Sequence, residues 1–333
     1  MANKVVMSGM RPTGKLHLGH YLGVLTNWKR LQEEYDCYFS IANWHALTTN
    51  YNNVSNLETN VYEVLKDWLA SGIDPDKSTI FLQSMLPEVA ILHVYLSMMT
   101  PHNWVERDPT LKDMVKIIKS KEGQIEATYG LIGYPVLMCS DIMSLNADYV
   151  PVGKDQLPHI EIARDIVRRF NNLYGTDFTE PKGLLNDVKL LAGLDGNKMG
   201  KSFNNDIKLS DTPEETAKKI MTGITDRNRI RKDDKGDPNN CEVIYKYWEI
   251  FAADTPKLTE IQDACRGAEI GCMQCKRMLA ELVNNELAPI RDKRAQYENN
   301  PDILKDILRE GAKKAQERAK FVMDKVELAI KSF

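Results

Sequence analysis

Two histidines occur in the segment PTGKLHLGHYLG, residues 12–23, where a strand pattern gives way to a helix pattern. His17 and His20 would lie on the opening turn of that helix, where the positive end of the helix dipole and two ring donors favour phosphate oxygens. Gly19 between them has no Cβ, so a flat ring could lie against the backbone there. The alternative is a helix start with two exposed histidines. A zinc site would need a third ligand, which the segment lacks.

A second segment, DGNKMGKS, spans residues 195–202 and combines small residues with two cations. Lys198 and Lys201 are point charges on flexible stems, which suit phosphate groups. Such a loop can close over a triphosphate and stabilise the charge that develops as pyrophosphate leaves. Taken alone, a short segment of this composition is more often a solvated turn.

Four of the six cysteines follow the pattern C-x23-C-x6-C-x2-C, in which Gly267 and Gly271 would ease the turns. These four are Cys241, Cys265, Cys272 and Cys275. Four thiolates suit either a zinc site or an iron–sulfur cluster. Zinc sites favour two tight knuckles and this quartet has one, so the spacing favours the larger inorganic core, with free thiols as the remaining alternative. Cys37 and Cys139 are expected to be buried small hydrophobic residues.

The net charge of −3 excludes a chain that is basic throughout, but residues 225–236 form a basic stretch. It carries Arg227, Arg229, Arg231 and Lys232. The two interpretations are a solvated loop and a patch that contacts RNA phosphates.

The composition fits a globular protein, because 43% of the 333 residues are hydrophobic and 27% are charged. No run approaches about 18 apolar residues, and the opening MANKVVMSG reads as a strand rather than a secretory signal. We therefore expect a cytoplasmic protein, in which clustered cysteines more often bind metal or do redox chemistry than form disulfides.

Strand and helix patterns alternate over the first two hundred residues. β-Branched or aromatic runs predict strands at 4–9, 37–43 and 79–84, and apolar residues at helical spacing predict helices over 20–35 and 56–72. This alternation predicts βαβ units and a parallel sheet that is covered on both faces and binds ligands at the carboxyl ends of its strands.

From residue 206 onward only helix patterns remain, over 212–224, 241–253, 271–298 and 302–333. We therefore expect an α/β fold in two domains. A Rossmann-like parallel-sheet domain would span residues 1–205, and an all-helical domain with the four cysteines would span residues 206–333.

Taken together, the two phosphate-type segments resemble the His-Ile-Gly-His and Lys-Met-Ser-Lys-Ser motifs of class I aminoacyl-tRNA synthetases. Here they read HLGH at 17–20 and KMGKS at 198–202, in the family's order around an α/β domain. The second motif departs from the family at Gly200, where serine is usual. The departure removes one hydroxyl donor and adds backbone freedom, but both lysines remain.

A third segment, YGLIGYPVLMCSDIMSLNADYVPVGKDQLPHIEIARD, residues 129–165, resembles the amino-acid pocket of the tryptophanyl and tyrosyl branch. Tyr134, Met138 and Asp141 fall at i, i+4 and i+7, on one helix face. Asp141 is a helix-surface acid, half of an internal ion pair, or an acceptor for a ligand donor. Indole offers one N–H and no acceptor, which suits a carboxylate and an apolar wall. Tyrosyl relatives usually have glutamine where Met138 lies, so the chain resembles the bacterial-type tryptophanyl-tRNA synthetases, almost end to end.

This resemblance implies an enzyme that activates L-tryptophan with ATP and Mg²⁺ to tryptophanyl-adenylate and pyrophosphate, and then transfers tryptophan to the 3′ end of tRNA(Trp). The implied catalytic residues are His17 and His20 at the phosphate transition state, and Lys198 and Lys201 on the pyrophosphate. The implied ATP site comprises Arg11, Pro12, Thr13, Gly19, His20, Gly153, Lys154, Asp155, Lys189, Lys198, Met199, Gly200, Lys201 and Ser202. Arg11 replaces the glutamine that is common in bacterial relatives. The implied tryptophan site comprises Met7, His45, Tyr134, Met138, Asp141 and Gln156, with His45 in a segment that matches the family's second strand and Gln156 on the α-amino group.

The family also implies a homodimer, with a tRNA that bridges its subunits and an anticodon held by the helical domain. Some tryptophanyl-tRNA synthetases carry a 4Fe–4S cluster on a closely similar C-x22-C-x6-C-x2-C pattern. The resemblance therefore favours such a cluster over Zn²⁺, in a structural or anticodon-contacting role. One alternative is a tyrosyl-tRNA synthetase, against which Met138 argues. A second is a non-catalytic RNA-binding paralogue, against which the intact motifs argue. A third is an iron–sulfur electron carrier, which would have no use for the nucleotide-binding half of the chain.

Overall fold

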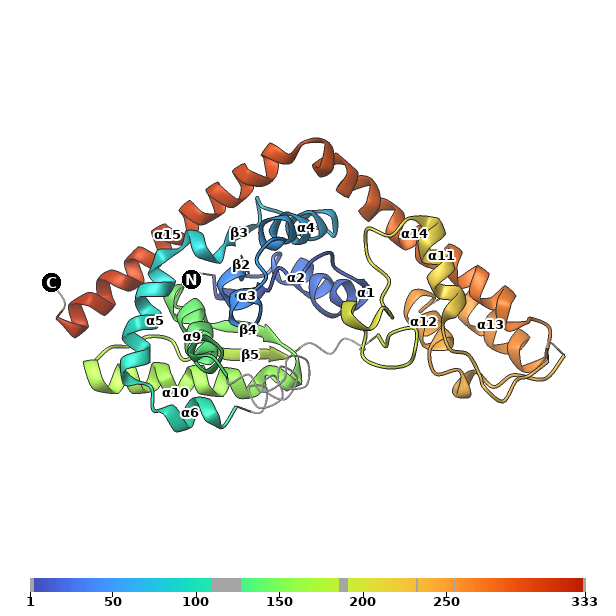
Figure 1. Cartoon of the computed structure of the whole chain (residues 1–333), viewed down its shortest axis with the longest axis horizontal. Coiled ribbons are helices and arrows are strands. Elements are labelled where there is room, and N and C mark those ends of the chain that lie inside the picture. The colour runs from blue at the N-terminus through green and yellow to red at the C-terminus, as the bar shows by residue number, and fades with distance from the viewer. Residues whose placement is uncertain (1–2, 109–126, 186–190, 232, 254, 332–333) are drawn as a thin grey trace.

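The computed structural model describes residues 3–108, 127–185, 191–231, 233–253 and 255–331. Its sheet has five parallel strands in the order β3-β2-β1-β4-β5 (Figure 1). They are β1 (Val5–Met10), β2 (Asp36–Ile41), β3 (Ser78–Leu82), β4 (Tyr149–Val152) and β5 (Lys182–Leu185). The order reverses between β1 and β4, and such a switch point is where parallel α/β sheets bind ligands. The expected α/β, Rossmann-like fold class is confirmed.

Side chains of successive strand residues point to opposite faces of the sheet, and each face has its own core. Val6 and Phe39 pack among residues of α2 (Thr26–Leu31) and α4 (Leu57–Ala70). Met7 and Tyr38 pack among residues of four other helices. These are α5 (Pro87–Met99), α9 (Tyr134–Ser144), α10 (Leu157–Tyr174) and α15 (Pro301–Ile330). Because both faces of the sheet are buried, consecutive residues of a strand are apolar, as in the VVM of β1 and the YF of β2.

Three strands were predicted from the sequence and two were not. The three runs at 4–9, 37–43 and 79–84 correspond to β1, β2 and β3 within two residues at each end. Strands β4 and β5 have four residues each, and they contain Pro151 and Gly183, which interrupt a strand pattern. The segment that was matched to a family strand, residues 42–48, lies instead in helix α3 (Asn43–Asn50), so His45 is on a helix.

No strand follows β5 in the described part of the chain, as expected, although Ala192 pairs with Lys198 and His17 with Lys208 in isolated antiparallel bridges. The elements that follow β5 are helices. The longer ones are α11 (Pro213–Thr222), α12 (Ile244–Phe251), α13 (Pro256–Arg266) and α14 (Cys272–Asn299). The short elements elsewhere are α1 (Leu18–His20), the π-helix η1 (Tyr21–Leu25), η2 (Gln83–Met85), α6 (His102–Glu106), α8 (Tyr129–Ile132), η3 (Lys154–Gln156), η4 (Lys201–Phe203) and η5 (Pro238–Asn240). In the described ranges, no helix combines the length and apolar character that a membrane crossing requires.

The last helix returns to the sheet. Helices α14 and α15 form a long arm from the helical end of the molecule back over the strands (Figure 1). Ala312, Ala315, Ala319 and Val326 of α15 are buried in the same core as the sheet residues Met7 and Phe81. A division at residue 205 therefore remains a proposal for the domains, while α15 shares its core with the sheet.

Gly311→Ala is expected to destabilise the protein. A methyl group at Gly311 would overlap the backbone carbonyl of Ile80 in β3, so α15 or the strand would have to shift. Overpacking of this kind costs about 1–3 kcal/mol, whereas helix propensity alone would make the change stabilising by about 1 kcal/mol. A urea unfolding midpoint that is lower for Gly311→Ala than for the parent would therefore report the close contact. Lys314→Ala, at an exposed position of α15, is the control. An unchanged or higher midpoint would contradict it.

Candidate active site

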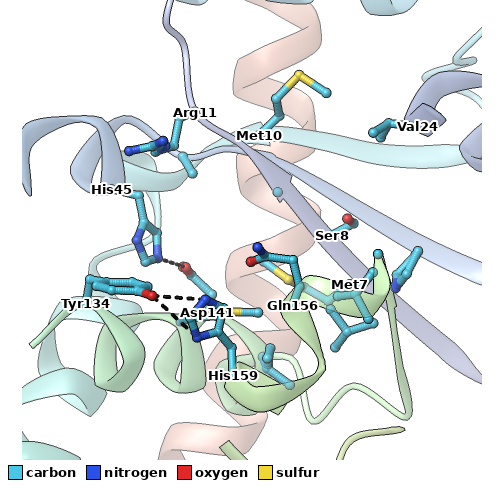
Figure 2. A pocket seen from close by; sticks show the side chains of 18 of the residues that line it. Met7, Ser8, Met10, Arg11, Val24, His45, Tyr134, Asp141, Gln156 and His159 are labelled. Atoms are coloured by element: carbon cyan, nitrogen blue, oxygen red, sulfur yellow. Dashed lines mark hydrogen bonds and ion pairs between the residues drawn. The ribbon is translucent and has the colours of Figure 1, made fainter. Parts of the chain in front are cut away.

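A cavity of about 530 Å³ opens at the switch point between β1 and β4. Its walls come from the carboxyl ends of these two strands, from α3 and α9, and from the start of α10 (Figure 2). All six residues expected at the amino acid line it: Met7, His45, Tyr134, Met138, Asp141 and Gln156. Arg11, His20 and Gly153 of the expected nucleotide set line the same cavity.

Asp141 is held by two neighbours at the cavity wall. Gln83 donates its side-chain amide to both carboxylate oxygens at 2.9 Å. His45 Nε2 lies 3.0 Å from Asp141 Oδ2, as the dashed line in Figure 2 marks. The other end of Gln83 accepts the backbone N–H groups of Trp44 and His45 at 3.0 and 3.3 Å. Asp141 is thus oriented on α9 and only 5% exposed. Gln83 was missed, although a polar residue directly after a buried strand was a signal that could have found it.

Tyr134 forms a compact polar cluster with two residues that sequence reasoning did not select. Its hydroxyl lies 2.6 Å from Asp108 Oδ2 and 2.9 Å from His159 Nε2. His159 Nδ1 lies 2.9 Å from the same Asp108 oxygen. Asp108 and His159 are almost fully buried, at 1% and 2% exposure, and His159 also lines the cavity.

The HLGH turn is fixed from two sides. Leu16 donates its backbone N–H to Asp67 Oδ2 at 2.7 Å, and Leu18 donates to the carbonyl of Ile207 at 2.9 Å. Burial raises the pKa of Asp67 to about 6, against the opposing positive charge of Arg294 on α14, which forms an ion pair with it. The turn before α1 is therefore tied both to α4 and to the segment that follows the lysine loop.

Both histidines of the turn are neutral near pH 7. Burial lowers the pKa of His17 to about 4, and burial with the neighbouring His17 and Lys201 lowers the pKa of His20 to about 3. Their ring centroids lie 3.8 Å apart. His17 Nδ1 is buried and has no hydrogen-bond partner among the residues that the structure describes. The pair can thus offer neutral ring donors to a ligand, rather than fixed positive charges.

The two motifs touch. Lys201 Nζ donates to the carbonyl of Gly14 at 2.7 Å and lies 3.4 Å from Thr13 Oγ1. A Cβ on Gly19 would lie 3.0 Å from the His17 ring, closer than most Cβ contacts, and at an ordinary contact distance of 3.4 Å from Met199 Sδ, so glycine relieves crowding within the HLGH turn. Burial lowers the pKa of Lys201 to about 8. Lys198, by contrast, is exposed to solvent.

The backbone conformation does not explain why glycine, rather than the family's usual serine, stands at position 200. Its φ of −169° is extended and open to any residue. A Cβ at Gly200 would lie 3.1 Å from the ring of Phe203, a side chain that is 67% exposed. A serine here would therefore displace only a surface ring.

Most of the remaining expected nucleotide residues fall in the described part of the chain. Pro12 and Thr13 line a smaller neighbouring cavity of about 180 Å³. Lys154 and Asp155 are exposed beside Gly153, and Arg11 Nη1 lies 3.5 Å from Thr49 Oγ1. Ser202 lies in η4, and Lys189 falls outside the described residues.

The four cysteines of the spacing pattern gather among the helices at the far end of the molecule. Cys241 precedes α12, Cys265 lies on α13, and Cys272 and Cys275 open α14. Burial raises the pKa of Cys241 and Cys265, and that of Cys275 to about 12, and nearby thiols of the quartet raise these pKa values further. No group of three or more His, Cys, Asp or Glu side chains in the described ranges is arranged to hold a metal ion.

The basic stretch lies next to these thiols. Arg227 and Arg231 are exposed, whereas Arg229 is half-buried with Nη1 3.9 Å from Cys265 Sγ. Lys232 falls outside the described residues. The expected patch is therefore divided, since one arginine faces a thiol and two face solvent.

Comparison with known proteins gives a consistent result. The family model "tRNA synthetases class I (W and Y)" matches residues 2–288. The chain is 42% identical to a tryptophan–tRNA ligase of Thermotoga maritima over 98% of each chain, and 39% identical to one of Aquifex aeolicus over 98% of this chain and 99% of that one. A crystal structure of tryptophanyl-tRNA synthetase from Campylobacter jejuni complexed with ADP and tryptophan superimposes with a TM-score of 0.89 at 36% identity, and covers 98% of this chain and 99% of that one. A tyrosyl-tRNA synthetase of Archaeoglobus fulgidus, 19% identical with a TM-score of 0.66, shares the fold.

Proposed function

Because this chain belongs to the class I tRNA synthetases of the tryptophan and tyrosine branch, we propose that its central cavity holds tryptophan and ATP side by side for the reaction of a tryptophan–tRNA ligase. The enzyme activates tryptophan with ATP and transfers it to tRNA(Trp). The observation that carries the site assignment is the convergence of Met7, His45, Met138, Asp141 and Gln156 on one cavity at the sheet's switch point.

Adenylate formation needs little covalent help from the protein. The tryptophan carboxylate attacks the α-phosphorus of ATP in line, the bond from that phosphorus to the α,β-bridging oxygen breaks, and pyrophosphate leaves. A Mg²⁺ ion bound together with ATP would neutralise part of the phosphate charge. The 3′-terminal ribose of tRNA then takes the acyl group and releases AMP. In our proposal His17 and His20 donate from neutral rings to the phosphate, and Lys201 and Lys198 neutralise the departing pyrophosphate. The contact between Lys201 and Gly14 supports this placement.

The amino-acid side of the proposal assigns the indole to the wall formed by Met7 and Met138, with its N–H donated to Asp141. The orientation of Asp141 by Gln83 and His45 supports this assignment. Pyrophosphate exchange tests it directly: the exchange should depend on tryptophan and not on tyrosine. Exchange driven equally by tyrosine would contradict the assignment.

The pH dependence should report Lys201. Its pKa is lowered to about 8 by burial, so in the free enzyme its ammonium is present below that pH and lost above it. We expect kcat/KM for ATP to fall as pH rises through about 8. Because His17 and His20 have pKa values of about 4 and 3, they should add no loss between pH 6 and pH 7. In Lys201→Arg the guanidinium stays charged, so the fall of kcat/KM at alkaline pH should disappear. If the fall persists in this variant, a group other than Lys201 causes it.

We further propose that Cys241, Cys265, Cys272 and Cys275 hold a 4Fe–4S cluster, with Zn²⁺ as the alternative. The spacing, the partial burial of all four cysteines and the mutual influence of their thiols support this proposal. Metal binding requires thiolates, and a bound metal would supply the charge that burial otherwise disfavours. The side chains would have to turn toward a common centre. The group would join the loop before α12 to α13 and α14, a structural role apart from the cavity.

Cys272→Ser should separate the two halves of the reaction. We expect it to lower metal and sulfide content and to weaken tRNA charging, while pyrophosphate exchange stays near the parent value. Elemental analysis, an absorption spectrum and both assays check this, with Cys37→Ser as a thiol control in the sheet. Equal loss of exchange and charging would contradict a role confined to the helices.

We propose that the enzyme works as a cytoplasmic homodimer that binds tRNA(Trp), with Arg227 and Arg231 among the RNA contacts. Helix α5 supports the dimer, because Ile91, Val94 and Met98 are 43%, 49% and 81% exposed at helical spacing. Such a patch is typical of a protein interface. A monomer at micromolar concentration in sedimentation would contradict it.

A further inference from the structure

We propose that Arg294 of helix α14 is a positioning residue for adenylate formation, because its guanidinium group fixes Asp67 and Asp67 fixes the backbone segment on which Lys201 rests. This inference rests on the proposed function of the cavity and on the proposed role of Lys201. It assigns to the adenylation site a residue of the same helix that begins at Cys272, among the four clustered cysteines.

Arg294 is buried where α14 packs along α4, and its side chain is 4% exposed. Its Nη1 donates to Asp67 Oδ1 and its Nη2 donates to Glu63 Oε2, both of which belong to α4. A guanidinium group presents its donors in a planar, fixed fork, whereas a lysine offers a single charge on a flexible stem. The two bonds therefore hold the carboxylate of Asp67 in one orientation.

Asp67 passes this orientation on to the segment that precedes the HLGH turn. Its carboxylate is fully buried, and Oδ2 accepts the backbone N–H of Leu16 at 2.7 Å. Lys201 Nζ donates to the carbonyl of Gly14, two residues before Leu16, at 2.7 Å. A shift of the Asp67 carboxylate would therefore displace both the start of the HLGH turn and the carbonyl that holds Lys201.

Asp67 also acts on the charge of Lys201. Burial lowers the pKa of Lys201 to about 8, and the negative charge of Asp67 opposes that fall. Asp206 opposes it as well, whereas the positive charge of Lys208 adds to it. The other titratable groups that interact with Lys201 are rings that are neutral near pH 7, those of His17 and His20.

Arg294 in turn keeps Asp67 charged. Burial raises the pKa of Asp67 to about 6, the positive charge of Arg294 opposes this rise, and the negative charge of Glu63 adds to it. Asp67 is therefore ionised at pH 7, and it would lose its proton less readily without Arg294. The guanidinium group thus supports the ammonium of Lys201 in two ways, through the position of Asp67 and through its charge.

Arg294→Met should lower kcat/KM for ATP in tryptophan-dependent pyrophosphate exchange about 10- to 100-fold, because a displacement of about 1 Å in a reacting geometry costs about 10²-fold. Its affinity for tryptophan by calorimetry should match the parent, since β1, α3, α9 and α10 form that side of the cavity. Arg291→Met is the matched control and should change neither quantity. Arg291 lies about one turn earlier on α14 and donates to Thr216 and Asn284 instead.

Two outcomes of this comparison would overturn the proposal. A folded Arg294→Met enzyme with the parent's kcat/KM for ATP would show that Arg294 does not position the site. Equal weakening toward ATP and tryptophan would show a general distortion of the protein.

Asp67→Asn separates charge from shape, because the amide oxygen can still accept the N–H of Leu16. Without the carboxylate charge the pKa of Lys201 falls further, so the alkaline fall of kcat/KM for ATP should move to lower pH than in the parent. A role of Asp67 that is structural alone would leave the position of the fall unchanged. An unchanged position would therefore overturn the link to Lys201.

The double variant Asp67→Asn/Arg294→Met checks that Arg294 acts through Asp67. Adding Arg294→Met to Asp67→Asn should lower kcat/KM for ATP little further, whereas independent roles would add the full loss of the single variant. An additional loss of 10-fold or more would overturn the proposal. The double variant also serves if Arg294→Met alone does not fold, because it leaves no unpaired Asp67 carboxylate and Glu63 keeps its partner Lys66 at 2.5 Å.

The controls distinguish failure of this inference from failure of the proposed function. If the parent shows no pyrophosphate exchange that depends on tryptophan, the proposed function fails. If Lys201→Arg retains the alkaline fall, the proposed role of Lys201 fails, and the inference fails with it. If the parent and Lys201→Arg behave as expected but Arg294→Met behaves like Arg291→Met, only the role of Arg294 is wrong.

Discussion

Lys201→Ala should slow tryptophan-dependent pyrophosphate exchange by about 10²- to 10³-fold, the usual cost of removing one preorganised charge-stabilising donor. The structure places this ammonium 2.7 Å from the carbonyl of Gly14, three residues before His17. Its partial burial strengthens its interaction with developing negative charge. Because that charge grows as pyrophosphate leaves, the loss should appear in kcat more than in KM for ATP.

Exchange kinetics at saturating tryptophan measure both constants. Lys218→Ala, which removes an exposed lysine of α11, is the matched control and should leave both unchanged. Lys198→Ala should have a smaller effect than Lys201→Ala, because Lys198 is exposed and water screens its charge. A Lys201→Ala enzyme with the parent's kcat and only a raised KM would show that this lysine binds ATP without stabilising the transition state.

Asp141→Ala should weaken tryptophan binding by about 10- to 150-fold, because it removes a charge-assisted hydrogen bond of about 1.5–3 kcal/mol. The variant also leaves the amide of Gln83 without its carboxylate, which adds to the cost. Calorimetry with tryptophan gives the affinity. Ser140→Ala on the same helix is the control, since Ser140 bonds the carbonyl of Val136 and does not line the cavity.

A ligand without the indole N–H separates recognition from structural damage. The parent should bind 1-methyltryptophan more weakly than tryptophan, and Asp141→Ala should lose most of that difference. If the variant binds tryptophan as tightly as the parent, the role of Asp141 is wrong. If it discriminates between the two ligands as well as the parent does, another group reads the indole nitrogen.

The sequence predicted the parts of the site that depend on local spacing. Tyr134, Met138 and Asp141 share one face because α9 is a regular helix. The approach of a flat ligand ring to the backbone at Gly19 stays a prediction. Strands β1 to β3 were predictable because buried parallel strands are continuous apolar runs. Strands β4 and β5 were missed because a proline and a glycine interrupt such short runs.

The residues that escaped sequence reasoning are those whose meaning comes from a distant partner. Gln83 contacts Asp141 across 58 positions, and Asp108 contacts Tyr134 across 26. No periodic pattern marks such pairs, since only the packing of separate helices brings them together. His45 was placed correctly at the cavity but on the wrong kind of element. The spacing of the cysteines selected four residues that lie near one another in the structure, but it did not predict how their thiols are arranged.

The return of α15 to the sheet has a consequence for how the protein is made. On the ribosome, the strands and their first helices emerge well before the arm that covers them. Helices α5, α9 and α10 cover part of the sheet face that carries Met7 and Phe81, but the part beneath α15 stays uncovered until the chain as far as Val326 has left the exit tunnel. The half that is translated first therefore completes its core last, and the helices of 213–299 can settle before it does. During synthesis, the apolar residues of the sheet core that pack against α15 remain without this part of their cover until the helix itself has been made.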